Sequence, residues 1–184
     1  NKRCLTPLCG TQLNNNKYRG YCLRCFMFTF PENEVKRNYK TKEYAVLEFI
    51  VNTFPNMDWI NDKTIEGGCS NYRPDFIADM GTHVIIVEVD ENKHSSYIKS
   101  CEEKRLNDLY QDNMRNMAYI RFNPDKYEEN GEKISSCWKV NKQGTMTIIK
   151  KKEWTERLNT LQEEIQYWID NVPDEPVKTK ELFY

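Results

Sequence analysis

The sequence predicts an α/β fold in which helices flank a mixed β-sheet, with a small cysteine-rich module ahead of the sheet. Three observations carry this prediction. Segments with helical spacing of apolar residues are interspersed with short, apolar, strand-like runs. One of these runs is apolar on both faces, as is typical of a central strand that is covered from both sides. Four of the seven cysteines lie within the first 25 residues.

The spacing of apolar residues predicts three helices. In residues 41–53 apolar side chains recur every three or four positions, and Pro55 then ends the pattern. Residues 95–112 place spaced apolar side chains among many charges and predict a second helix. Residues 151–170 predict a third, amphipathic helix.

The central part of the sheet is predicted by a hairpin. Residues 76–78 form one strand, and Gly81 closes a turn to a second strand that ends at Val89. In that second strand Ile85 and Val87 lie on one face and Ile86 on the other, so both faces are expected to be buried.

Three further segments complete the expected secondary structure. Residues 117–122 predict another buried strand, which Asn123 and Pro124 end. A short strand is expected around Trp59, and a hairpin is expected near residues 142–144. The order of helices and strands favours a mixed sheet with helices against it.

The domain organisation follows from these elements. We expect a cysteine module in residues 1–38, a core domain in residues 39–150 that carries the candidate catalytic residues considered below, and a C-terminal amphipathic helix and tail in residues 151–184. A chain of 184 residues is long enough for one ordinary domain and one accessory module, at roughly 100–200 residues per domain.

Charge is distributed unevenly along the chain. Residues 1–42 hold nine Lys and Arg against two Asp and Glu, a balance of +7, which leaves −8 for the rest of a chain whose net charge is −1. A basic segment before an acidic body suits a module that contacts phosphates beside a core that gathers divalent cations. The alternative is a merely solvated basic face.

The sequence also indicates a compartment. We find no secretory signal pattern and no apolar run near the roughly 20 residues that cross a bilayer. Seven cysteines cannot all pair in intramolecular disulfides. These features favour a reduced intracellular location, in the cytoplasm or nucleus, and no membrane partner.

The four early cysteines predict a structural zinc site. Cys4 and Cys9 enclose four residues, Cys22 and Cys25 enclose two, and two such pairs can supply four thiolates to tetrahedral Zn²⁺. A segment this short has no core of its own, so the metal would supply its folding energy. The alternatives are two disulfides or four unrelated thiols. The lone cysteines are expected to be packed as small apolar side chains: Cys69, Cys101 and Cys137.

Basic side chains make the module a candidate nucleic-acid contact. Lys17, Arg19 and Arg24 are cationic, and Tyr18 and Tyr21 offer rings for stacking. The alternative is a purely architectural module.

An acidic constellation supplies the main functional hypothesis. Asp75 begins one hairpin strand, and Glu88 and Asp90 end its partner with their side chains on one face. Hairpin pairing would bring Asp75 to the same end, where repelling carboxylates favour a bound Mg²⁺ or Mn²⁺. His94 follows four residues after Asp90 and could move a proton near neutral pH.

These residues resemble a known family pattern. Arg73-Pro74-Asp75, a strand ending in Glu88-Val89-Asp90, and then His94 and Tyr97 resemble the PD-(D/E)xK nuclease superfamily. The branch that the sequence resembles is that of the very-short-patch-repair and related homing endonucleases, over roughly residues 40–125.

The resemblance implies a restriction-endonuclease-like fold and a role for each matching residue. Glu43 matches the helix glutamate, Asp75 and Glu88 match the two acids that bind metal, and Asp90 and His94 stand where the superfamily has its lysine. Lys93 is the other candidate for that lysine. Arg73 and Lys93 are candidate nucleic-acid contacts beside the acids. The resemblance also includes Glu102 and Arg105 on the next helix and Arg121 on the following strand.

Several alternatives stay open at this point. Asp75 could only cap a turn, Glu43 could only complement a helix dipole, and His94 could be a plain loop residue. Arg121 could pair with a carboxylate or contact phosphate, and His83 is expected to be structural.

The expected function is metal-dependent hydrolysis of DNA phosphodiester bonds. The runner-up is a nucleic-acid-binding module that keeps the nuclease fold without turnover, since Asp90 occupies the lysine position. A third reading is a protein-interaction adaptor. The sequence leaves open RNA as substrate, site specificity, nicking against double-strand cleavage, biological role and oligomeric state.

Overall fold

The apolar runs of the sequence pair into one five-stranded mixed sheet in a computed structural model of the chain. The structure describes residues 2–7, 9–13, 18–22, 25–26, 29–30, 42–61, 74–91, 99–142 and 146–184. The chain divides into two units, residues 1–38 and residues 39–184.

In the N-terminal unit a short hairpin begins the cysteine module. Strand β1 (Lys2–Arg3) pairs antiparallel with β2 (Gln12–Leu13), and the N–H of Cys4 donates to the carbonyl of Thr11 over 2.8 Å. Gly20 has φ +86°, and a Cβ there would approach the side chain of Leu5 to 2.7 Å. The positive φ of this turn favours glycine, whereas the exposed side chain of Leu5 could move aside.

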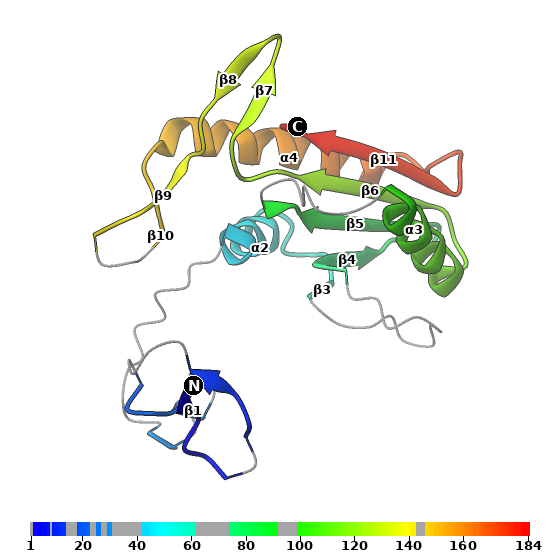
Figure 1. Cartoon of the computed structure of the whole chain (residues 1–184). Coiled ribbons are helices and arrows are strands. Elements are labelled where there is room, and N and C mark those ends of the chain that lie inside the picture. The colour runs from blue at the N-terminus through cyan, green and yellow to red at the C-terminus, as the bar shows by residue number, and fades with distance from the viewer. Residues whose placement is uncertain are drawn as a thin grey trace. The chain divides into compact units, whose positions relative to one another are not determined.

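The larger unit is built on the mixed sheet. Its strand order is β11-β6-β5-β4-β3, with β11 drawn in red at one edge in Figure 1. The strands are β3 (Trp59–Asn61), β4 (Phe76–Asp79), β5 (Val84–Val89), β6 (Met117–Phe122) and β11 (Val177–Leu182). Strand β4 pairs antiparallel with both β3 and β5, whereas β5, β6 and β11 run parallel to one another. The predicted mixed sheet is confirmed.

Helices cover both faces of the sheet through two apolar clusters. Helices α2 (Lys42–Thr53) and α4 (Lys151–Asp170) contribute to one cluster, in which Ile50 and Leu161 pack with Val87 of β5. Helix α3 (Lys99–Asn113) contributes Leu109 to the other cluster, beside Ile86. Alternate residues of β5 therefore face opposite layers, and every residue of this strand is buried, as its sequence predicted.

Two small hairpins extend from the sheet. Strands β9 (Trp138–Val140) and β10 (Met146–Ile148) pair antiparallel, so the hairpin expected near residues 142–144 is confirmed. Strands β7 (Tyr127–Glu129) and β8 (Glu132–Ile134) form a hairpin that we did not predict. Asn130 and Gly131 connect them with φ of +52° and +80°, as a tight hairpin turn requires.

The C-terminal segment belongs to the larger unit. Helix α4 packs on the sheet, and β11 adds an edge strand to it where the sequence had suggested only a tail. The reason is that β11 is a parallel edge strand with mostly half-exposed or exposed side chains, and such a strand lacks the apolar run that identifies a buried one.

Three single-residue expectations concern packing. Cys137 is fully buried in the apolar cluster, as predicted, whereas Cys69 and the side chain of Cys101 lie outside the described residues. His83 is buried, and its Nε2 lies 2.6 Å from the carbonyl oxygen of Trp168 in α4. The structural role expected for His83 is confirmed.

Candidate functional site

The end of strand β5 places two carboxylates on one face of the sheet. Glu88 is the penultimate residue of β5, and Asp90 follows the strand. Both share the face of Ile86, which packs toward α3, and each is only 2% exposed. Acidic side chains are rarely this buried unless they are paired, so their partners define the site.

Asp75 lies across the hairpin from these two residues. Phe76 of β4 pairs with Val87 of β5, so the residue before β4 reaches the end of β5. The Oδ2 of Asp75 accepts a hydrogen bond from the N–H of Val89 over 2.8 Å, and the carbonyl of Asp75 accepts one from the side chain of Asn61 over 3.1 Å. The structure therefore brings Asp75, Glu88 and Asp90 together, and we call these three residues the acidic cluster.

Glu88 has an arginine partner from helix α3. The Nη2 of Arg105 donates to Oε1 of Glu88 over 2.5 Å. Burial raises the pKa of the Glu88 carboxyl to about 8. The charges of Asp75 and Asp90 also raise this pKa, and only the guanidinium of Arg105 opposes them. Burial and the two neighbouring carboxylates together outweigh the effect of Arg105 on the Glu88 pKa.

Asp90 has two partners, one on β6 and one just after the end of β11. The Nε of Arg121 in β6 donates to Oδ2 of Asp90 over 2.5 Å, and the hydroxyl of Tyr184 donates to the same oxygen. The guanidinium of Arg121 also lies 5.1 Å from the centre of the Tyr184 ring, which is a cation–π distance. Asp90 is therefore fixed from two sides.

Arg121 spans three strands of the sheet. It lies opposite Glu88 on β5 and opposite Glu181 on β11, and its Nη1 donates to Oε1 of Glu181 over 2.9 Å. Of the two roles left open for Arg121, the structure shows pairing with carboxylates. Sequence reasoning missed Glu181 and Tyr184 because it did not predict β11.

Glu43 lies in the first turn of α2 and is half-buried. Its neighbour Lys42 is buried, and the Lys42 Nζ lies 2.7 Å from Oδ1 of Asp125 and 3.5 Å from Oε2 of Glu91. Glu91 follows Asp90 directly, so the ion pair of Lys42 with Glu91 links the start of α2 to the end of β5.

Five of the expected site residues lie outside the described residues: Lys17, Arg24, Arg73, Lys93 and His94. Glu102 lies on α3, and its side chain is also outside them.

The cysteine module brings its four sulfur atoms together. The Sγ atoms of Cys4, Cys9, Cys22 and Cys25 all lie within 4.8 Å of one another. Cys9 Sγ lies 3.8 Å from that of Cys22 and 3.5 Å from that of Cys25, and none of the four forms a disulfide. The N–H of Cys22 donates to Cys4 Sγ over 3.2 Å, as suits a thiolate ligand. The group could hold a metal ion such as zinc.

Within the described part of the chain, this is the one group of three or more His, Cys, Asp or Glu side chains whose ligand atoms come so close. The acidic cluster does not reach that spacing, and its two most buried members each lie against an arginine.

The aromatic side chains of the module pack with one another. Tyr18 contacts Phe26, and Tyr21 contacts Phe30, with ring centroids 5.4 and 5.7 Å apart. The guanidinium of Arg19 lies 5.2 Å from the Phe30 ring centre. Arg19 itself is exposed, so its charge remains accessible to a partner.

Comparison with known proteins adds no relative. No protein-family model matches the chain, and no curated protein matches it.

Among the described helices, none combines the length and apolar character that crossing a bilayer requires.

Proposed function

We propose that the chain is a divalent-metal-dependent endonuclease that hydrolyses phosphodiester bonds of DNA. The observation that carries the proposal is the acidic cluster: a buried Glu88 at the end of a central strand, with Asp75 and Asp90 close enough to raise its pKa. Crowded carboxylates that disfavour their own ionisation are characteristic of functional sites. The mixed sheet flanked by helices agrees with the coarse architecture that the nuclease resemblance implies.

The donor chemistry of the acidic cluster suits an oxygen-preferring cation, although its oxygen atoms are not as close together as the four cysteine sulfur atoms. Asp75 and Glu88 offer carboxylate oxygens from two adjacent strands, and such ligands suit Mg²⁺ or Mn²⁺. When bound, a divalent cation supplies Lewis-acid activation of water and offsets charge on the phosphate. Binding would also relieve the repulsion that raises the Glu88 pKa.

The other residues of the site hold and orient these groups. Arg105 fixes the Glu88 carboxylate, and Arg121 with Tyr184 fixes Asp90. Two guanidinium groups beside the acids also supply positive charge where a phosphodiester would approach. His94 keeps the role of general acid or base that the sequence suggests for it.

The N-terminal unit is proposed to be a structural Cys4 zinc module. Four convergent thiols leave no open position for water, so zinc here would stabilise the fold rather than take part in hydrolysis. Arg19 and the other basic residues of this unit are proposed to contact nucleic-acid phosphates.

One observation favours the runner-up, a nucleic-acid-binding module without turnover. Glu88 and Asp90 each already have an arginine partner, and such pairs can hold a fold together without any metal. A plasmid assay separates the two functions. Mg²⁺-dependent nicking or cutting of supercoiled plasmid supports the endonuclease, whereas salt-dependent DNA binding without cleavage supports the binding module.

A further inference from the structure

Among the described residues, no strand pairs with the outer edge of β11, which is paired with β6 on its other side. The carbonyl of Pro176 accepts from the N–H of Met117, and that of Leu182 accepts from the N–H of Asn123, so the even-numbered positions of this segment bond to β6. In a parallel pair the main-chain groups of alternate residues point to opposite sides of the strand. The N–H and C=O groups of Val177, Thr179 and Glu181 therefore point away from the sheet.

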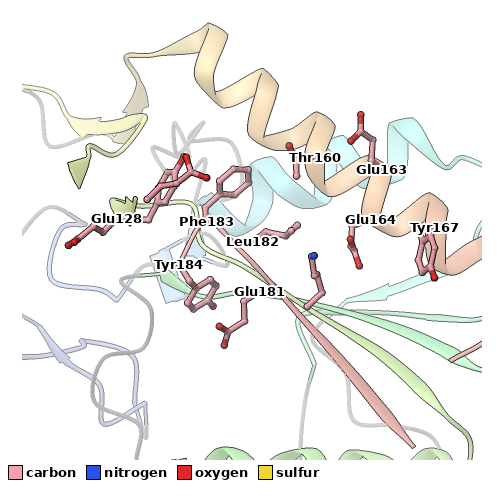
Figure 2. A pocket seen from close by; sticks show the side chains of 12 residues that line it. Glu128, Thr160, Glu163, Glu164, Tyr167, Glu181, Leu182, Phe183 and Tyr184 are labelled. Atoms are coloured by element: carbon pink, nitrogen blue, oxygen red, sulfur yellow. The ribbon is translucent and has the colours of Figure 1, made fainter. Parts of the chain in front are cut away.

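A groove runs along this edge. One hollow of about 620 Å³ is bordered by α4, by β7 and by the end of β11. A second hollow of about 590 Å³ shares Glu164, Tyr167 and Lys180 with the first, so the two are continuous. Figure 2 shows Thr160, Glu164 and Tyr167 on α4 along one side of the first hollow, and Glu181 and Tyr184 along the other. We call the two hollows together the edge groove.

The edge groove is strongly acidic. Five glutamates line the first hollow against a single lysine, Lys180: Glu128, Glu129, Glu163, Glu164 and Glu181. Glu181 is paired with Arg121, so the other four supply the excess of negative charge. Lys178 lines the second hollow, but its Nζ lies 3.1 Å from Asp174 and 3.1 Å from Glu175, which neutralise it. The electrostatic potential along the outer edge of β11 is therefore negative.

The edge groove also exposes apolar side chains. Tyr167 is 54% exposed and Val172 is 56% exposed, although both are large and apolar enough to be expected inside. Tyr127 and Phe183 add aromatic rings to the first hollow. An open strand edge flanked by apolar contacts is the surface on which an extended peptide adds a strand.

From these features we infer that the edge groove binds an extended, lysine- or arginine-rich peptide segment of a partner protein, which pairs with β11 as a sixth strand. Main-chain bonds to Val177, Thr179 and Glu181 give affinity, and the glutamates select basic side chains. A nucleic acid is repelled by the same glutamates, and edge-to-edge pairing of two copies places like charges together. This inference does not depend on the nuclease proposal.

Two fluorescent seven-residue peptides test the inference by anisotropy with the full chain. In one, lysine alternates with valine; in the other, glutamate alternates with valine. We expect the basic peptide to bind and the acidic one to bind at least about tenfold more weakly, with the preference falling as salt screens the charges. Equal binding of the two peptides, or no binding of the basic one, overturns the inference.

Charge-reversal variants locate the binding. Glu128 and Glu163 are exposed, so Glu128→Lys with Glu163→Lys is compatible with folding and is expected to weaken the basic peptide about tenfold. Glu103→Lys with Glu156→Lys is the matched control, since both glutamates are exposed and neither lines either hollow. It should change binding by less than about twofold. Equal effects of both changes overturn the inference.

A backbone variant tests strand addition itself. Thr179→Pro removes an N–H that points outward and leaves the bonds to β6 intact, which an edge strand tolerates. We expect weaker peptide binding with an unchanged circular dichroism spectrum, and slowed exchange of the Val177 and Glu181 amide protons in the wild-type complex. Unslowed exchange contradicts strand addition. A wild-type dimer in sedimentation that Thr179→Pro dissolves also contradicts it, since the occupant is then a second copy.

Discussion

The guanidinium of Arg105 donates to the Glu88 carboxylate over 2.5 Å and thereby links helix α3 to the end of the central strand. The contact is almost completely buried on the Glu88 side, where the side chain is 3% exposed. One guanidinium nevertheless does not restore the ordinary pKa of Glu88, because burial and two further carboxylates act against it. This combination of burial and neighbouring carboxylates underlies the first two predictions.

Removing one charge from the acidic cluster should abolish cleavage while preserving the fold. Asp75→Asn and Glu88→Gln keep the shape of each side chain, but each removes an anionic oxygen ligand for the cation. We expect each variant to cut supercoiled plasmid in Mg²⁺ at least about 100-fold more slowly than the wild type.

The control for these variants is Glu103→Gln, since Glu103 is an exposed glutamate on α3. It should cleave at the wild-type rate. If Asp75→Asn and Glu88→Gln both cleave like the control, the nuclease proposal fails and the binding-module proposal takes its place.

The raised pKa of Glu88 predicts a pH-dependent stability in the absence of added divalent cations. The folded chain holds the Glu88 proton up to about pH 8, whereas the unfolded chain loses it near the ordinary value of 4.5. The stability from this protonation is thus complete below about pH 4.5 and is lost as pH rises through 8. The Glu88→Gln variant has no proton to lose here. Its free energy of unfolding should therefore rise relative to that of the wild type between pH 4.5 and about 8, by roughly a few kcal/mol at most.

Urea unfolding at pH 5, 7 and 9 measures this difference. A stability difference that stays constant over the three pH values would show that Glu88 titrates normally. The measurement uses no chelator, so that any zinc held by the four N-terminal cysteines is not removed.

Much of the larger unit follows from local pattern. Strand β6 and helix α4 have the bounds that the sequence predicts, because the pattern of apolar residues in each segment is clear enough to predict its secondary structure. The positions of Asp75 and Glu88 also follow locally, since one hairpin turn at Gly81 fixes their register.

The partners of the acidic cluster do not follow from local pattern. Arg121 meets Asp90 and Glu181 only through the alignment of three parallel strands, and that alignment is set by distant crossovers. Tyr184 depends on β11, whose half-exposed side chains give little signal. The hairpin of β7 and β8, in contrast, has a local sequence signal, because the pair Asn130 and Gly131 is typical of a two-residue hairpin turn.

The cysteine module should contain about one tightly bound Zn²⁺ per chain. Four thiols within 4.8 Å of one another form the ligand set, and a metal would supply most of the folding energy of this unit. Cys22→Ser should release the metal and unfold residues 1–38, while Cys137→Ser serves as a control that keeps the zinc ligands. Metal analysis that finds no zinc, with disulfides seen under non-reducing conditions, would contradict this prediction.

Deleting residues 1–38 should weaken DNA binding and flatten its salt dependence. The deletion removes seven Lys and Arg and only two Asp and Glu, so fewer counterions are released from DNA on binding. Each lost phosphate contact should reduce the slope of log K against log salt by about 0.9. An unchanged slope in a filter-binding or anisotropy titration would assign these charges to a solvated surface.

Arg121 should contribute more to stability than an arginine whose equally short ion pair is with an exposed carboxylate. Arg121→Met leaves Asp90 buried without its guanidinium partner, and we expect a loss of about 3–5 kcal/mol in the free energy of unfolding. Tyr184→Phe removes one hydrogen bond to the same carboxylate and should cost about 1.5–3 kcal/mol.

The reference for this comparison is Arg115→Met. Arg115 donates to both carboxylate oxygens of Asp79, over 2.5 and 2.7 Å, and to the carbonyl of Gly81 over 3.0 Å. The Asp79 side chain is 58% exposed, so water replaces the lost partner. The expected cost there is about 1 kcal/mol or less. Adding Asp90→Asn to Arg121→Met should recover part of the larger loss, because the uncompensated charge is gone. If Arg121→Met costs no more than Arg115→Met in urea unfolding, Asp90 is solvated in solution and the buried site at the end of β5 is not formed as described.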